Sequence, residues 1–176
     1  MPDELDGDLL RRFAQGDRDA FEALCKQFEA EVYRWILRIV RDAGTAEDVL
    51  VEAFWRAYRG RARFDPSRSF GAWMRRIATN VARDHLRAAR ARGRNTTHGG
   101  IPAPAVGDDG LAESVALAFR KLPPKLHVAA TLALIEERPY AEIADALDVP
   151  VGTVKSRVFR AIRALRKELA LLGIRP

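Results

Sequence analysis

The sequence lacks several features that mark common classes of protein. Cys25 is its single cysteine, which excludes an internal disulfide and a metal site built from several thiolates. No apolar run reaches the length of a membrane-spanning helix, and the N-terminus lacks the pattern of a signal peptide. We therefore expect a cytoplasmic protein without membrane insertion, in which Cys25, beside Leu24 and Phe28 on an apolar helix face, is a core residue.

Patterns typical of enzymes and of β-sheets are also missing. The three histidines, His85, His98 and His127, are scattered, and the sequence shows no Ser/His/Asp arrangement, metal-ligand spacing or glycine-rich phosphate loop. No segment alternates apolar and polar residues with the period of a strand. The sequence therefore predicts an all-α protein with no catalytic residues, no metal site and no cofactor.

The basic residues of the chain are concentrated in two places. The 176 residues have a net charge of +6 and a pI of about 10.0, although residues 1–31 carry nine acidic side chains against four basic ones. Residues 61–94 carry ten arginines against two aspartates, and residues 153–176 carry seven basic side chains against one glutamate. Two separate basic patches indicate two contacts with nucleic acid.

Residues 140–169 carry the strongest single pattern, which predicts a helix-turn-helix. Ile143, Ala144 and Leu147 share one side of the first helix. Asp148 tolerates the left-handed conformation of a sharp turn, and Pro150 suits the first position of a new helix because a proline has no amide to leave unpaired there. The second helix then has a buried stripe and a basic outer face, which fits the major groove of DNA. The outward residues that we expect to contact DNA are Thr153, Lys155, Ser156, Arg157 and Arg160.

The N-terminal part of the chain is also predicted to be helical. Leu9, Leu10 and Phe13 indicate a short helix that ends near Gly16, and a longer helix with Asp17 as its N-cap follows. We expect a loop over residues 42–45 and then a helix over residues 45–58, which Thr45 opens with a capping-box spacing. A loop over residues 60–69 leads to a last helix over residues 69–92.

One face of the helix over residues 45–58 combines a large aromatic side chain with charged ones. Such a composition is more typical of a protein-binding patch than of a solvated surface. The patch consists of Asp48, Glu52, Trp55 and Arg56.

The loop over residues 60–69 and the basic helix after it suit single-stranded nucleic acid. Phe64 lies in a polar, basic loop, where its ring is expected to stack on a base, while arginines follow the phosphates. Asn80 carries both a donor and an acceptor for a base edge. The other residues expected to take part are Asp65, Ser67, Arg68, Ser69, Arg75, Arg76 and Arg83.

Glycine and proline punctuate residues 93–110, which contain few apolar residues. We interpret this stretch as a flexible linker. It divides the chain into an N-terminal helical bundle over residues 1–92 and a C-terminal helix-turn-helix domain over residues 111–176.

Five motifs, in this order, resemble the extracytoplasmic-function (ECF) sigma factors of bacterial RNA polymerase. They are GDRDAFEAL from Gly16, AEDVLVEAFWRAYR from Ala46, FGAWMRRIATNVARDHLR from Phe70, LPP at Leu122 and YAEIADALDVPVGTVKSRVFRA from Tyr140. The resemblance covers nearly the whole chain.

This resemblance implies specific partners for the residues above. The N-terminal domain is expected to bind the polymerase clamp through Asp48, Glu52, Trp55 and Arg56, and to open the minus-10 promoter element. Its ligand there is implied to be the non-template single strand, with Asn80 and Asp84 matching positions near it. The C-terminal domain is expected to read the duplex minus-35 element and to touch the polymerase flap. An anti-sigma factor that sequesters the chain is a further partner that the resemblance allows.

Two other functions fit the residues less well than a sigma factor does. A stand-alone helix-turn-helix regulator accounts for the C-terminal domain but leaves Asp48, Glu52, Trp55 and the second basic patch without a role. An enzyme is rejected because no catalytic motif is present.

Overall fold

A computed structural model describes residues 6–92, 109–171 and 173–174 of the chain. The regular structure of these residues consists of helices, with no strand, so the predicted all-α class is confirmed. The chain forms two compact units, residues 1–85 and 86–176, which are described separately. The predicted linker over residues 93–110 lies outside the described residues except for Asp109 and Gly110, which already belong to a helix.

The first two helices begin at aspartates that cap them. Helix α1 spans Gly7–Gln15, and the Asp6 carboxylate accepts a hydrogen bond from the Asp8 amide. Helix α2 spans Arg18–Val40, and the Asp17 carboxylate accepts from the amides of Asp19 and Ala20. Between these helices Gly16 has a φ of 96°, a conformation that a residue without a Cβ adopts at little cost. Both helices and the Asp17 cap were predicted.

Helix α3 begins earlier than predicted. It spans Ala43–Gly60, so residues 43–45 are helical and not part of a loop. The Asp42 carboxylate accepts from the Thr45 amide at 2.8 Å and from the Thr45 hydroxyl at 2.6 Å. The proposed Thr45 cap is therefore wrong, because Asp42 satisfies the free amide and uses the Thr45 hydroxyl as a second donor.

A short 3₁₀ turn, Arg61–Arg63, follows α3 and leads through an exposed loop to helix α4, Phe70–Ala91. The Ser69 hydroxyl accepts from the Ala72 amide at 3.3 Å and so caps α4. Thr79, which is 1% exposed, accepts from the indole N–H of Trp35 at 2.9 Å and donates to the Arg75 carbonyl at 2.7 Å. These bonds join α2 to α4 through a satisfied buried hydroxyl.

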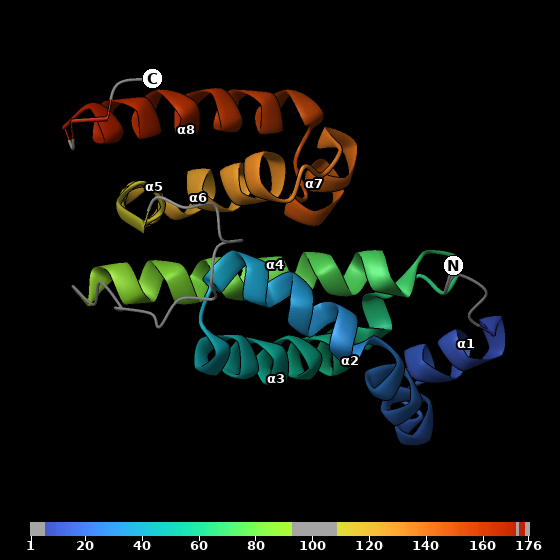
Figure 1. The fold of residues 1–176 in the computed structure, drawn as a ribbon. Coiled ribbons are helices and arrows are strands. Elements are labelled where there is room, and N and C mark those ends of the chain that lie inside the picture. Colours follow the sequence, from blue (N-terminus) through green and yellow to red (C-terminus); the bar gives the residue numbers. More distant parts are fainter. Residues whose placement is uncertain (1–5, 93–108, 172, 175–176) are drawn as a thin grey trace. The chain divides into compact units, whose positions relative to one another are not determined.

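The core of the first unit forms where the apolar stripes of its helices meet. Figure 1 shows α2 and α3 side by side, in agreement with their close backbone packing. Cys25, which was predicted to be a core residue, is only partly buried. The largest fully buried side chains of this unit are Phe13, Leu24, Val32, Ile36, Ile39, Val49, Phe70, Met74 and Val81.

From Asp109 onwards, the described residues of the second unit form four helices and one π-helical turn. These elements are α5 (Asp109–Lys121), α6 (Pro124–Ala130), the π-helical turn Thr131–Ile135, α7 (Tyr140–Leu147) and α8 (Val151–Leu171). Helices α5, α6 and α8 share one apolar core. His127 is 8% exposed within this unit, and its Nδ1 lies 2.9 Å from the Phe119 carbonyl oxygen, so it links α6 to the last turn of α5.

The turn between α7 and α8 has the predicted conformation. Asp148 is left-handed, with a φ of 53°, and its amide and that of Val149 bond back to carbonyls of α7. Helix α8 begins at Val151, one residue later than expected, because Pro150 supplies the carbonyl that accepts from the amides of Thr153 and Val154. The helix-turn-helix prediction is confirmed in both helices.

Candidate nucleic-acid and protein interfaces

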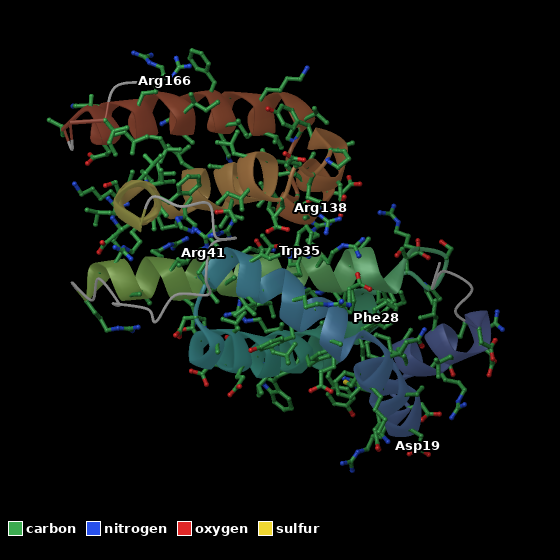
Figure 2. All side chains as sticks on the ribbon, viewed as in Figure 1. Asp19, Phe28, Trp35, Arg41, Arg138 and Arg166 are labelled. Atoms are coloured by element: carbon green, nitrogen blue, oxygen red, sulfur yellow. The ribbon has the colours of Figure 1, made fainter. Side chains whose placement is uncertain are left out.

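The outer face of α8 carries the residues predicted to contact DNA. Val154, Val158, Ala161 and Leu165 are buried against the rest of the unit, which leaves the opposite face of α8 outside. Ser156, Lys155 and Arg160 are exposed, and Thr153 and Arg157 are half-buried. All five predicted residues thus occur within the first ten residues of α8. Figure 2 shows Arg166, further along, on the side of α8 that faces away from α6, so the basic face continues beyond them.

Phe159 is a candidate contact that sequence reasoning missed. Its side chain is 61% exposed in the middle of the basic face, although an aromatic ring normally packs inward. The signal in the sequence was its position directly after Val158, which puts it outside the apolar stripe. An exposed apolar ring on such a helix can contact a thymine methyl group, which arginine and lysine do not recognise.

The outer face of α3 is apolar as well as charged. Trp55 is 58% exposed, as expected, and Val51, one turn earlier, is 72% exposed. Asp48 is also exposed. Val51 was not predicted, because a single valine on a helix surface is common and carries no signal until its neighbour Trp55 is known to be outside. Together the two side chains form a patch that suits a protein partner.

Glu52 and Arg56 lie beside this patch and contact α4. The Arg56 guanidinium donates to one Glu52 oxygen at 2.7 and 3.0 Å and to Asp84 at 3.3 Å. The other Glu52 oxygen lies 3.3 Å from Nε2 of His85. The hydrogen bond from His85, followed by that from Arg56, lowers the pKa of Glu52 below its ordinary value. The structure thus joins residues that were assigned to two different partners, Glu52 and Arg56 to polymerase and Asp84 to DNA.

Phe64 lies in the core and not on the surface. Its side chain is 5% exposed, and its ring centroid lies 4.9 Å from that of Trp73 and 5.6 Å from that of Phe70. The prediction that Phe64 offers a stacking surface to a base is therefore wrong. The Phe64 ring is buried because it packs against three other aromatic rings in the interior of this unit. The polar sequence around Phe64 gives no sign of these distant partners.

The loop after Phe64 is a compact, exposed turn. The Asp65 carboxylate accepts from the Ser67 hydroxyl at 2.7 Å and from its amide at 3.0 Å, and these bonds lower the pKa of Asp65. The Arg68 amide donates to the Asp65 carbonyl at 2.9 Å. Arg68 and Ser69 are exposed. The four polar residues are therefore accessible, although one Asp65 oxygen accepts from Ser67 and the other lies 3.5 Å from Nε of Arg68.

Arg75, Arg76, Asn80 and Arg83, four residues of α4 predicted to contact the single strand, divide into two groups. Arg75 lies 2.5 Å from Glu31 and over the Trp35 ring at 5.8 Å, and its side chain is only 24% exposed. This corrects the expectation that Arg75 follows phosphates, because its charge is already paired with Glu31 on α2. Arg76, Asn80 and Arg83 are half-buried and lie at i, i+4 and i+7, on one face of α4.

The described residues lack two other kinds of feature. They contain no group of three or more histidine, cysteine, aspartate or glutamate side chains that could hold a metal ion. None of their helices is both long enough and apolar enough to span a membrane.

Comparison with known proteins gives matches for both units. Residues 24–92 match the family model described as Sigma-70 region 2, and residues 112–165 match Sigma-70, region 4. The chain is 33% identical to the ECF RNA polymerase sigma factor SigW of Bacillus subtilis over 91% of this chain and 94% of SigW. The chain belongs to the ECF sigma factor family. It is also 34% identical to the RNA polymerase sigma-H factor of Pseudomonas aeruginosa, over 96% of both chains.

Further relatives support this membership in sequence and in fold. The ECF sigma-E factor of Escherichia coli is 34% identical over 89% of this chain and 90% of its own. Among solved structures, CnrH in complex with the cytosolic domain of CnrY matches with a TM-score of 0.60 and 27% identity over 96% of this chain and 97% of that chain. The sigma factor RpoE from Bartonella quintana, solved with the anti-sigma factor NepR, has the same fold, with a TM-score of 0.55 and 20% identity over 85% of this chain and 96% of that chain.

Proposed function

We propose that this ECF sigma factor directs core RNA polymerase to promoters by dividing three contacts between its two units. The observation that carries the proposal is the exposed pair Val51 and Trp55 on α3. A regulator that only bound duplex DNA through α8 would have no use for an apolar patch on the other unit. A sigma factor needs such a patch because it must bind polymerase as well as DNA.

The polymerase contact in this proposal is the outer face of α3. Trp55 and Val51 supply the apolar centre that sets residence time, and Asp48 on the rim contributes to the rate of association. Glu52 and Arg56 stand at the edge of the patch, where they also hold α4. The clamp is the part of polymerase that we assign to this face, and the flap is assigned to the second unit.

The minus-35 contact in this proposal is the outer face of α8. Arg157 and Arg160 are assigned to base recognition, and Thr153, Lys155 and Ser156 to phosphates and shorter base contacts. Phe159 is added to this set because of its exposure. Gly152 leaves the start of α8 bare, since a Cβ placed there would meet no atom within 4 Å.

The minus-10 contact in this proposal is the loop at residues 65–69 with one face of α4. Asp65, Ser67, Arg68 and Ser69 present polar groups to an unstacked base of the non-template strand. Four residues on α4 lie along the path assigned to the strand: Arg76, Asn80, Arg83 and Asp84, which is paired with Arg56. Phe64 and Arg75 are no longer part of the set.

The proposal also covers the domain boundaries, the cellular location and a further partner of the chain. Residues 1–92 and 111–176 remain our proposed domains, and the two family-model matches fall inside them. The chain is proposed to have no catalytic activity of its own, since polymerase performs the chemistry. Its partners, polymerase and promoter DNA, place it in the cytoplasm. An anti-sigma factor is included as a candidate partner because the similar CnrH and RpoE were solved in complexes with CnrY and NepR.

Footprinting with and without core polymerase tests the proposal against a stand-alone regulator. Genomic fragments are incubated with the full chain alone, with polymerase alone and with both. The proposal expects protection of two separated segments only when both proteins are present. Tight, specific protection of duplex DNA by the chain alone would favour the stand-alone regulator.

A further inference from the structure

Both ends of the exposed loop over residues 65–69 are fixed by one cluster of four aromatic rings. Phe64 precedes the loop and Phe70 follows it, and their ring centroids are 5.6 Å apart. Trp73, one turn into α4, lies 4.9 Å from Phe64 and 5.8 Å from Phe70. The chain therefore leaves the core at one ring, makes the exposed turn, and returns to the core at an adjacent ring.

The fourth ring of the cluster, Phe13, comes from α1. Its centroid lies 5.9 Å from Phe64, 5.4 Å from Phe70 and 6.0 Å from Trp73, so each of the four rings contacts the other three. Phe13 is completely buried. It is more than fifty residues from the loop in sequence, and it also precedes residue 24, where the match to Sigma-70 region 2 begins.

The end of α1 is held against the same region by a second contact. A Cβ placed on Gly16 would lie 3.0 Å from Nε of Arg61, so the turn after α1 approaches the 3₁₀ turn that leads to Phe64. Arg61 in turn lies over the Tyr58 ring at 4.5 Å and donates to the Tyr58 carbonyl at 2.8 Å. Helix α1 is therefore fixed relative to the loop's entry as well as to its rings.

We propose that Phe13 and Phe64 are positioning residues that hold the loop in the geometry required to read an unpaired base. Polar groups discriminate between bases only when they are held within about 0.5 Å of the productive position. The loop's internal bonds, from Ser67 and Arg68 to Asp65, fix its own shape but not its place on the unit. That place is fixed by Phe64, and the ring that supports Phe64 from outside the loop and α4 is Phe13. This inference rests on the proposed minus-10 contact and assigns a new task within it to α1.

The test measures base discrimination by the full chain bound to core polymerase. The probe is a pool of single-stranded oligonucleotides with six randomised positions between fixed ends, and the bound fraction is sequenced. Phe13→Leu and Phe64→Leu keep an apolar side chain in the core but remove the ring contacts. Ile36→Val and Ile36→Ala are the controls, because Ile36 is completely buried on α2 in the same unit and is not one of the four rings. Thermal unfolding of all variants identifies the Ile36 variant whose stability is nearest to that of the phenylalanine variants, and this variant is the matched control.

The inference expects the parent and the matched Ile36 variant to enrich the same motif. Phe13→Leu and Phe64→Leu should lose at least about tenfold of the discrimination at one or two positions. Affinity for core polymerase and selection from a randomised duplex pool should remain at the parent's level, since none of the four rings belongs to the exposed faces of α3 and α8 that carry those contacts.

Three results would overturn the inference. Phe13→Leu and Phe64→Leu could discriminate as the parent does, or they could lose no more than the Ile36 variant of equal stability, which would show that the rings only stabilise the fold. A parent that enriches no single-stranded motif would refute the proposed minus-10 contact, and the inference with it. Binding to polymerase in the same experiment keeps this last outcome separate from a chain that is simply inactive.

Discussion

Substitution of Trp55 by alanine gives a clean measure of the proposed polymerase contact. The side chain is 58% exposed in the free chain, so its removal leaves little cavity and should change the free energy of unfolding by less than about 0.5 kcal/mol. Any large effect on binding can then be attributed to the partner.

The expected magnitude follows from the exposed area. A tryptophan offers about 250 Å², of which 58% is about 145 Å². Complete cover by polymerase at about 25 cal/mol per Å² gives about 3.6 kcal/mol as an upper value. Because binding energy is not recovered in full from buried area, we expect Trp55→Ala to cost about 2 kcal/mol, a loss in affinity of about thirtyfold.

The assay is titration of labelled full chain with core polymerase, read by fluorescence anisotropy. Asp48→Ala should cost less than Trp55→Ala and should act on the association rate, because Asp48 lies on the rim. Gln27→Ala, at an exposed position of α2, is the control and should bind as the parent. Unchanged affinity in a Trp55→Ala, Val51→Ala double variant would refute the assignment of α3.

Three further predictions concern recognition, stability and pH. In promoter-binding assays with polymerase, Arg160→Ala should cost about 1–3 kcal/mol of binding free energy and relax the preference at one base pair. Lys155→Ala should weaken binding to all sequences alike and reduce the slope of log affinity against log salt concentration by about one. Equal losses on every promoter variant for both substitutions would mean that α8 contacts only the DNA backbone. His127→Ala should destabilise the second unit by about 2 kcal/mol, because it removes a buried ring and the hydrogen bond to the Phe119 carbonyl. The three tryptophans all lie in residues 1–92, so in denaturant unfolding the tryptophan fluorescence reports the first unit alone, whereas circular dichroism reports both. A loss of stability seen only in the fluorescence transition would contradict this prediction. Because the pKa of Glu52 is lower in the folded chain than its ordinary value of 4.5, the Glu52 carboxylate contributes stability above pH 4.5, and this contribution is lost as the pH falls through the folded pKa. The melting temperature of Glu52→Gln should therefore fall less than that of the parent when the pH is taken from about 6 to about 3. Parallel curves of melting temperature against pH would exclude the Glu52 network as a source of acid sensitivity.

The helices and the helix-turn-helix could be predicted because their causes are local. The Asp17 carboxylate caps amides two and three residues later, and Asp148 is left-handed and donates its own amide to the Asp145 carbonyl. The apolar stripe of α8 repeats at the helical period. The start of α3 failed for a related reason. Both Asp42 and Thr45 are competent caps, and the choice between them depends on which conformation residues 43–45 adopt.

The candidate site was harder to predict because its errors involve residues distant in sequence. Phe64 has polar neighbours on both sides, and nothing near it in the sequence indicates that Phe13 provides a buried surface for its ring. The pairing of Arg75 with Glu31 joins positions 44 residues apart, so a basic helix face read from α4 alone counts a charge that α2 has already neutralised. The exposure of Val51 and Phe159 likewise depends on which helix faces remain uncovered after packing.

Run-off transcription is the most direct test of the central claim that this chain confers promoter recognition on core polymerase. Purified core polymerase is given a pool of genomic fragments, with and without the full chain, and the transcripts are sequenced from their 5′ ends. The proposal predicts discrete start sites that appear only with the chain, share two upstream sequence elements, and weaken with Trp55→Ala and with Arg160→Ala. Start sites that are the same with and without the chain would contradict it.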